Sequence, residues 1–241
     1  MTDFHTHTLP GIDDGSRSAE QSAQMLSALF SMGFDKVMFT PHYYPDEQSI
    51  SDFLQKRDKA YKEFTSFASS SEDLKLPSFG FGAEVYLHPI LFNSKDEDIK
   101  LLTVDSGGRI MLTEMEYSDT VSDVTLGMLN RLIYNFGIIP VLAHIERYPF
   151  MLEERNVINM LEMGCLCQIN VSSLNTKGIR RKLIKYIRKG YICAIGSDIH
   201  SPLSISEVSS GLSELSGKEK AIISHESARM NNRSNIQNFF D

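Results

Sequence analysis

Short apolar runs alternate with longer amphipathic segments along almost the whole chain. Seven of these runs are rich in β-branched and other apolar residues and have the length of buried strands. They lie at Asp3–His7, Lys36–Pro41, Phe79–Val85, Arg109–Met115, Ile138–His144, Cys165–Val171 and Tyr191–Ser197. Because longer helical segments separate the runs, the pattern predicts parallel strands joined by helical crossovers.

Apolar residues between the runs recur at helical spacing. The predicted helices are roughly Ser18–Met32, Ser51–Phe67, Thr120–Asn135, Phe150–Met163, Lys177–Lys189 and Ser204–Leu215, with one more from Glu219 to about Arg229 before a polar tail. Gly33, Gly137, Gly164 and Gly190 stand directly before the next strand, where a left-handed C-cap favours glycine. No linker or internal repeat interrupts the series, and no eighth strand is found. The sequence therefore predicts an α/β fold, a seven-stranded barrel in a single domain over residues 1–241.

Composition narrows the class of protein. The chain has 241 residues, of which 41% are hydrophobic and 23% charged, and its net charge is −7. This acidic balance argues against general attraction to nucleic acid or to an anionic membrane. The N-terminus lacks the pattern of a secretory signal, and no apolar stretch is long enough to span a bilayer. Three cysteines in strand-like sequence indicate buried free thiols and a reducing cytoplasm.

Ionisable side chains gather at or just after the C-terminal ends of the predicted strands. They are His5, His7, Asp13, Asp14, His42, Glu84, Glu114, Glu116, His144, Asp198 and His200. In an α/β barrel these ends meet at one face, which is where such folds build active sites. His5 and His7 alternate onto the same side of their strand, so both rings can reach one ion. Mixed nitrogen and oxygen ligands without thiolate suit Mn, Fe or Zn.

Other hydrolytic chemistries can be tested against the sequence. A cysteine-dependent phosphatase needs an arginine six positions after its nucleophile, but the three cysteines are followed there by Val171, Ser173 and Ile199. No Gly-x-Ser-x-Gly elbow and no Walker-type phosphate loop occurs in the chain. Water activated by metal ions is the remaining nucleophile.

Five motifs together resemble those of a known family. They are the segment from Phe4 to Ser16 (FHTHTLPGIDDGS), the Thr40–Tyr43 turn (TPHY), Gly82–Glu84 (GAE), Ala143–Tyr148 (AHIERY) and Gly196–His200 (GSDIH). In this order they resemble the polymerase-and-histidinol-phosphatase (PHP) family. More narrowly, they are similar to its bacterial branch of manganese-dependent protein-tyrosine phosphatases of capsular and exopolysaccharide synthesis. The resemblance implies a distorted (β/α)7 barrel of the PHP type.

The resemblance also implies three metal positions. The first would be held by His5, His7, Glu84 and Asp198, the second by Glu84 as a bridge with Glu114 and His144, and the third by Asp14, His42 and His200. Asp14 is preferred to Asp13 because it directly precedes Gly15, and Glu114 to Glu116 because it follows an apolar strand. The expected cofactor is two or three Mn ions, with Fe, Zn or Mg as alternatives.

The resemblance implies that Arg147 binds phosphate through its planar, bidentate guanidinium, and a simple surface salt bridge is the alternative role. Its neighbour Glu146 is expected to orient other groups or to lie at the surface. Related bacterial tyrosine phosphatases usually carry a second arginine shortly after the Asp-x-His motif, but residues 201–206 contain none. The resemblance implies hydrolysis of phosphotyrosine on a protein partner, a bacterial tyrosine kinase that regulates capsular or exopolysaccharide synthesis.

Three other functions compete with the hydrolysis of phosphotyrosine. A small-molecule phosphatase, such as one acting on histidinol phosphate, would use the same metal chemistry. A polymerase-associated nuclease is disfavoured by the acidic balance and by the lack of basic patches with interleaved aromatic residues. A regulatory module with a vestigial metal site is disfavoured because the set of candidate ligands is unbroken.

Overall fold

The computed structural model describes residues 1–71 and 73–232. The predicted polar tail at residues 233–241 lies outside the described residues. No helix in the described part of the chain is both long enough and apolar enough to cross a membrane.

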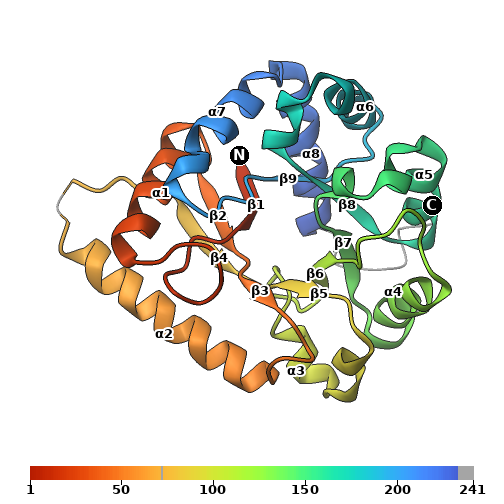
Figure 1. Ribbon diagram of the computed structural model, residues 1–241, viewed down its shortest axis with the longest axis horizontal. Coiled ribbons are helices and arrows are strands. Elements are labelled where there is room, and N and C mark those ends of the chain that lie inside the picture. The colour runs from red at the N-terminus through yellow and green to blue at the C-terminus, as the bar shows by residue number, and fades with distance from the viewer. Residues whose placement is uncertain (72, 233–241) are drawn as a thin grey trace.

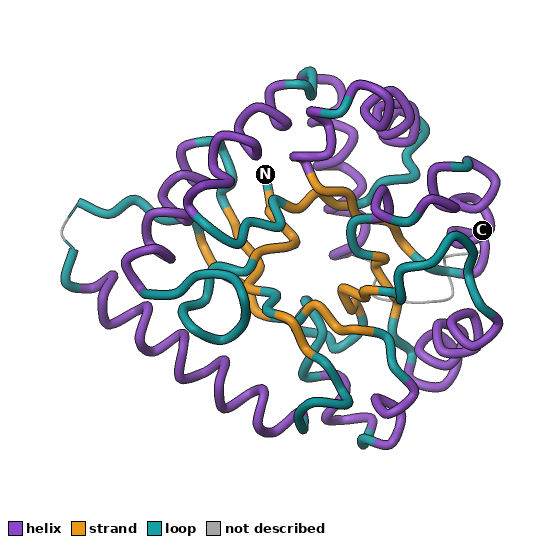
Figure 2. The backbone as a smooth tube through the Cα atoms, in the orientation of Figure 1, coloured by secondary structure: helices purple, strands orange, loops and turns teal. Residues whose placement is uncertain are grey.

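Parallel strands form the wall of a barrel, with the helices outside it (Figure 2). The strands are β1 (Thr2–Thr6), β2 (Lys36–Phe39), β3 (His42–Tyr43), β4 (Ser78–Phe81), β5 (Glu84–Tyr86), β6 (Ile110–Glu114), β7 (Ile139–Leu142), β8 (Leu166–Asn170) and β9 (Ala194–Gly196). They pair in the orders β1-β2-β4 and β3-β5-β6-β7-β8-β9. The backbone of β1 meets the chain after β9, where the Asp198 N–H donates to the His5 carbonyl at 2.8 Å.

The predicted strand Phe79–Val85 is broken into β4 and β5, and the predicted strand Lys36–Pro41 ends as β2 at Phe39, with the short β3 following from His42. The break between β2 and β3 falls at Thr40 and Pro41, and proline has no N–H to give to a strand ladder. The break between β4 and β5 falls at Gly82 and Ala83, where a side chain at Gly82 would meet Val104 at 2.5 Å. Since each pair of pieces continues one wall position, the prediction of seven strands is confirmed.

Eight helices among the described residues surround the wall (Figure 1). They are α1 (Ala19–Ser31), α2 (Ile50–Ser69), α3 (Asp96–Lys100), α4 (Asp123–Phe136), α5 (Glu154–Met163), α6 (Lys177–Arg188), α7 (Ile205–Ser213) and α8 (Gly217–Asn232). The four glycines expected at helix ends all have positive φ, which confirms that prediction. The short α3 was not predicted. The predicted start of the helix Phe150–Met163 is wrong, because a 3₁₀ turn at Pro149–Leu152 and an extended Glu153 precede α5.

Two apolar layers hold the barrel together. The larger cluster lies between the strands and the helices and includes Leu26, Phe64 and Leu183. The smaller cluster joins residues of strands from all round the barrel, among them Phe4 of β1, Leu112 of β6 and Leu166 of β8. Side chains from opposite strands meet only inside a barrel, so this second cluster forms its floor. The polar candidate site lies at the C-terminal ends of the strands, above that floor.

Candidate metal centre

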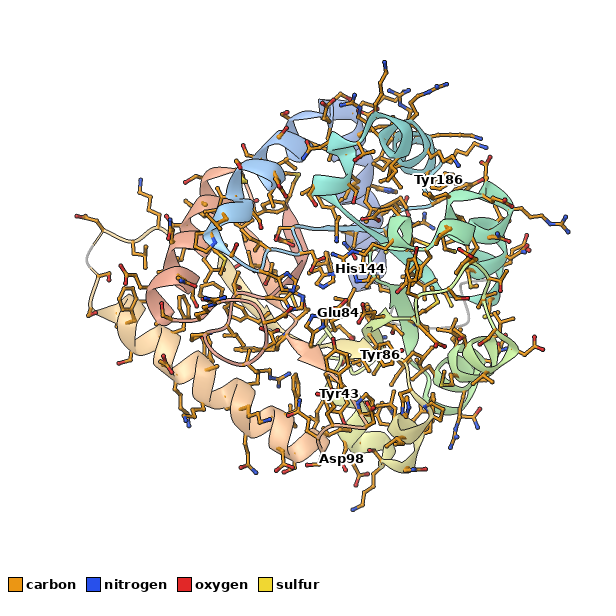
Figure 3. The ribbon with its side chains drawn as sticks, in the orientation of Figure 1. Tyr43, Glu84, Tyr86, Asp98, His144 and Tyr186 are labelled. Atoms are coloured by element: carbon orange, nitrogen blue, oxygen red, sulfur yellow. The ribbon has the colours of Figure 1, made fainter. Side chains whose placement is uncertain are left out.

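Four buried side chains converge at the centre of the barrel. The Nε2 atoms of His5 and His7 lie 3.0 Å apart. Glu84 Oε2 lies 3.1 Å from the first nitrogen and 3.3 Å from the second. Asp198 Oδ1 lies 3.4 Å and 3.3 Å from the same two nitrogens. Figure 3 shows Glu84 near the middle of the ring of strands, with His144 beside it. The alternation of β1 therefore brings both histidine rings to one point, as the sequence predicts.

The directions of these atoms fit a cation better than they fit mutual hydrogen bonds. Glu84 Oε2 is buried and has no hydrogen bond of acceptable geometry with any described residue, although three imidazole nitrogens lie within 3.3 Å of it. The nearby His42 Nδ1 is also buried without a hydrogen bond. An unpaired buried carboxylate oxygen is costly in isolation. Nitrogen and oxygen donors that point at a common space are the ligand set of a divalent metal ion.

Glu84 also reaches a second group of candidate ligands. Its Oε1 lies 2.8 Å from His144 Nε2, and Glu114 Oε1 lies 3.7 Å from that same nitrogen. Pairing of β3 with β5 sets His42 beside Glu84, and His42, Glu84 and Glu114 offer ligand atoms within 4.8 Å of one another. Glu116, the alternative to Glu114, is exposed and belongs to none of the ligand-like groups among the described residues. The carboxylate of Glu84 thus stands between two sets of donors.

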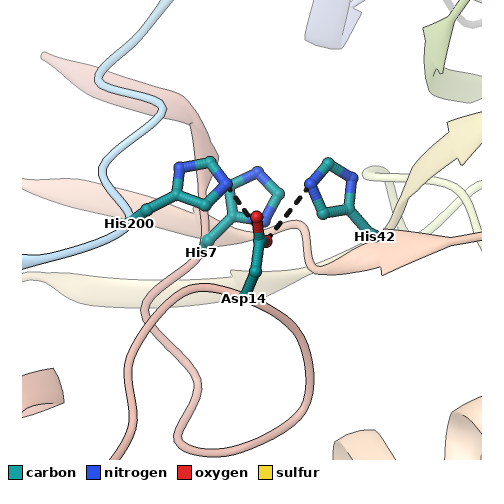
Figure 4. A group of neighbouring side chains, drawn as sticks. All are labelled: His7, Asp14, His42 and His200. Carbon is teal, nitrogen blue, oxygen red and sulfur yellow. Dashed lines mark ion pairs between the residues drawn. The ribbon is translucent and has the colours of Figure 1, made fainter.

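A third group lies at the mouth of the barrel (Figure 4). Asp14 Oδ1 is 3.5 Å from His42 Nε2 and 3.4 Å from His200 Nε2. The ring of His7 stacks on that of His200 with centroids 4.0 Å apart, so His7 faces this group as well as the first. The neighbouring Asp13 instead accepts a hydrogen bond from the His42 N–H and lies 2.8 Å from His7 Nδ1. The geometry therefore favours Asp14 as a ligand and Asp13 as a support for His7.

The backbone around these groups is locally strained or tightly packed. Two non-glycine residues of the described chain have positive φ, His144 at 33° and Asp198 at 51°. Such conformations are uncommon and tend to occur at functional sites. The loop that carries Asp14 folds onto β1 so closely that a side chain at Gly15 would meet the His7 carbonyl at 2.1 Å. The chain thus fixes the positions of these side chains through its backbone.

The charges of the buried side chains at the centre favour a bound cation. Burial raises the pKa of the Glu84 carboxyl, but the His5 charge, the hydrogen bond between Glu84 Oε1 and His144, and the nearby imidazoles outweigh it and hold the pKa well below its usual range. Burial and repulsion from Glu84 raise the pKa of Glu114 to about 7. Burial lowers the pKa of His144, which favours the neutral ring that binds metals. A cation between Glu84 and Glu114 would relieve their repulsion.

Gln168 and Asn170 of β8 form a buried support that sequence reasoning missed. Gln168 Oε1 accepts a hydrogen bond from the His144 N–H at 2.7 Å and lies 3.4 Å from His5 Nδ1. Its Nε2 donates to Asn170 Oδ1 at 2.9 Å, and Asn170 Nδ2 donates to Asp198 Oδ2 at 2.7 Å. The signal was present, since two polar residues alternate within an otherwise apolar strand. Buried polar side chains usually serve a hydrogen-bond network.

Arg147 and Glu146 lie on the 3₁₀ turn Ile145–Arg147 after β7. Arg147 is half exposed and forms an ion pair with Asp198 Oδ2, one of the predicted metal ligands. Glu146 is buried, and its Oε1 accepts hydrogen bonds from the Asn170 N–H and the Ser173 hydroxyl, both at 2.9 Å. Burial raises the pKa of Glu146 to about 7. Of its two predicted roles, the orienting one fits these contacts.

Room for a substrate exists beside the third group. A cavity of about 400 Å³ is lined by Asp13, Asp14, His42, Tyr44 and Lys56, among others. At the place where related phosphatases carry a second arginine, the 3₁₀ turn Pro202–Ser204 instead exposes Leu203. Mixed polar and aromatic walls next to a cation site suit a phosphorylated ligand with an aromatic or other bulky group.

The cysteines lie away from this chemistry. All three are buried and form no disulfide bond. Burial raises the pKa of Cys165 to about 12 and that of Cys167 well above its usual range. Since the thiolate is the reactive form, neither side chain is suited to act as a nucleophile.

The sequence of the chain is similar to those of known proteins. Residues 1–212 match the family described as "Capsular polysaccharide synthesis, CpsB/CapC". The tyrosine-protein phosphatase CpsB of Streptococcus pneumoniae is 30% identical over 83% of each chain. The tyrosine-protein phosphatase YwqE of Bacillus subtilis is 25% identical over 83% of this chain and 78% of its own.

Solved structures share the fold. A chain from the crystal structures of YwqE and CpsB, described as metal-dependent tyrosine phosphatases, superposes with a TM-score of 0.74 at 21% identity and covers 96% of this chain and 95% of that one. The phosphotriesterase homology protein of Escherichia coli gives a TM-score of 0.52 at 13% identity, with 95% and 97% of the two chains covered.

Proposed function

The chain belongs to the CpsB/CapC family of capsular polysaccharide synthesis, and from this premise we propose that it is a metal-dependent protein-tyrosine phosphatase. Relatives named as tyrosine-protein phosphatases match most of its length. The single observation that carries the proposal is the buried Glu84 carboxylate, whose two oxygens face four imidazoles within 3.3 Å. The reaction is the hydrolysis of a phosphate monoester to a free tyrosine hydroxyl and inorganic phosphate.

The proposed ligand set is the nine residues grouped at the mouth of the barrel. His5, His7, Asp14, His42, Glu84, Glu114, His144, Asp198 and His200 would hold two or three Mn ions. When bound, the ions would activate a water molecule for attack on phosphorus and neutralise the phosphoryl oxygens. Glu84 holds its charge between two donor sets, Asp13 meets the His7 ring at Nδ1, and Gln168 holds the backbone N–H of His144.

Arg147 supplies the proposed phosphate contact from this chain. Its side chain is 50% exposed and pairs with Asp198, a proposed ligand. The planar fork can therefore meet a phosphate at the mouth of the barrel while it remains close to the centre. The guanidinium donates N–H groups to the phosphoryl oxygens, where negative charge builds in the transition state.

The proposed partner is a bacterial tyrosine kinase that carries phosphotyrosine and regulates capsular or exopolysaccharide synthesis. The names of the relatives support a phosphotyrosine substrate, and the name of the family supports the pathway. A cytoplasmic location is proposed because the three cysteines are buried and form no disulfide bond, as expected in a reducing compartment.

The test is steady-state hydrolysis of a phosphotyrosine peptide beside histidinol phosphate at equal concentration. Turnover of the peptide should stop on chelation, return with Mn and persist after replacement of all three cysteines by alanine. A preference for histidinol phosphate would instead make the protein a small-molecule phosphatase. Activity that survives complete removal of metal would contradict the proposed chemistry.

A further inference from the structure

Helix α6 and the residue after it carry a concentration of positive charge unlike the rest of the chain. Seven of the 24 lysines and arginines lie between Lys177 and Lys189, with no aspartate or glutamate among them. The whole chain has a net charge of −7 and this segment +7, so the remainder carries −14. The acidic net charge of the whole chain disfavours polyanionic partners, but it does not describe this basic segment.

Neighbouring helices neutralise only part of this charge. Glutamates pair with four of the seven cations: Glu214 with Arg180, Glu154 with Lys185 and Lys189, and Glu219 with Arg188. Lys177, Arg181 and Lys182 are exposed and form no ion pair with any residue that the structure describes. The unpaired charge is therefore confined to the N-terminal half of the helix.

Lys177, the first residue of α6, does not stabilise the helix. The first turn contains no acidic residue, and Thr176 makes no side-chain capping bond. Positive charge near a helix N-terminus opposes the helix dipole. Burial of Leu183, Tyr186 and Ile187 holds the helix against the barrel instead, and Figure 3 labels Tyr186 on it. Residues that oppose local stability while lying exposed are typical of a functional surface.

The N-terminal half of α6 lies at the end of the barrel that carries the candidate metal centre. In a barrel of this kind each helix starts where the preceding strand ends, and α6 follows β8 after the 3₁₀ turn Val171–Asn175. Asn170, at the end of β8, donates a hydrogen bond to Asp198 of the centre at 2.7 Å. Lys177 comes seven positions later in the sequence. Seven residues span at most about 25 Å when fully extended. A substrate segment of similar length can therefore reach from the metal centre to Lys177.

Resting on the proposed phosphatase function, we propose that Lys177, Arg181 and Lys182 form a docking surface for an acidic segment of the protein substrate. That segment is rich in aspartate, glutamate or further phosphotyrosine and lies several residues from the phosphotyrosine that enters the centre. Charge complementarity favours this partner, because exposed cations steer and retain an anionic chain. A bilayer fits less well, since the buried apolar residues of α6 face the core and offer nothing to insert.

The first test compares two charge-removing triple variants. One carries Lys177→Gln, Arg181→Gln and Lys182→Gln. The matched control carries Lys59→Gln, Lys62→Gln and Lys75→Gln, three exposed lysines on α2 or in the segment after it that form no ion pair with any described residue. Figure 1 shows α2 at the lower left and α6 at the upper right of the barrel.

The substrates are two phosphotyrosine peptides, one with an acidic segment about six to ten residues from the phosphotyrosine and one with the amide counterparts. At low salt the wild type should prefer the acidic peptide by about five- to tenfold in kcat/KM, through KM, and lose the preference at high salt. The α6 variant should lose the preference with kcat unchanged, while the control variant should keep it. An equal preference in the α6 variant and the wild type would overturn the proposal.

A binding measurement keeps this test separate from catalysis. A fluorescent acidic peptide without phosphotyrosine should bind the wild type and the control variant, and bind the α6 variant at least fivefold more weakly, by anisotropy at low salt. This result would support the docking surface even if no phosphopeptide were hydrolysed, an outcome that would refute the phosphatase function alone. Wild-type binding to phosphatidylglycerol vesicles or single-stranded DNA without binding to the acidic peptide would overturn the docking proposal.

Discussion

Replacement of Gln168 by methionine tests how the barrel wall supports the candidate metal centre. Gln168 is fully buried, and its amide joins His144, His5 and Asn170. Methionine has a similar length but offers neither a strong acceptor nor a donor. The substitution would leave the backbone N–H of His144 and the side-chain Oδ1 of Asn170 buried without their present partner.

The structure sets the size of the expected effect. Each of the two buried polar groups left unpaired costs about 1–3 kcal/mol, so Gln168→Met should lower the free energy of unfolding by about 2–6 kcal/mol. Loss of groups that orient metal ligands typically weakens metal binding by about 10- to 100-fold. The weakest ion should be lost first, because His5, His144 and Asp198 would no longer be held through one network.

The assay separates these two effects. Unfolding by urea with a chelator present measures stability without bound ions, and titration calorimetry with Mn measures affinity. Cys167→Ala on the same strand is the matched control, because its buried thiol belongs to the outer apolar layer. It should cost about 1–2 kcal/mol in unfolding free energy and leave Mn affinity unchanged. Equal Mn affinity in Gln168→Met and the wild type would refute the positioning role.

Three further predictions concern single charged residues. Glu84→Gln should lose at least one ion by elemental analysis and lower the hydrolysis rate by about 100-fold or more, because the shared negative charge is removed; full metal content at the full rate would exclude a bridge. Arg147→Ala should keep its ions but raise the barrier by about 2–4 kcal/mol in steady-state kinetics, with partial rescue by lysine; a wild-type rate would make it a surface residue. Glu219 accepts hydrogen bonds from Ser216 and pairs with Arg188, which lower its pKa to about 2. Its stabilisation should therefore be complete above the unfolded pKa near 4.5 and decline as pH falls towards 2. Glu219→Gln should cost about 1 kcal/mol at pH 7 in urea unfolding, and a cost that does not shrink from pH 5 to pH 3 would contradict the assignment.

Much of the fold could be predicted because each strand carries a strong local signal. Apolar runs such as Ile138–His144 have no alternative to burial, and the glycines after helices mark left-handed caps that other residues adopt with strain. The breaks at Pro41 and Gly82 could not be located in the same way, since they depend on neighbouring strands and on the contact with Val104. The short α3 is also below the length at which periodicity is informative.

For the candidate site, too, the sequence predicts some features and not others. The residues at strand ends could be gathered from the sequence because barrel topology brings those ends together. Which carboxylate faces which imidazole depends on loop geometry, and the choice of Asp14 became distinct only when Asp13 was found against His7. The roles of Gln168 and Asn170 cannot be seen in the sequence, because their hydrogen-bond partners His144 and Asp198 lie far away along the chain.

Anomalous scattering from crystals grown with Mn tests the central claim most directly. Data collected on both sides of the Mn absorption edge count the bound ions and give their positions. The account predicts two or three Mn peaks among the nine proposed ligands, with Glu84 between two of them. A fully active protein whose crystals show a single ion, or ions that do not touch Glu84, would contradict it.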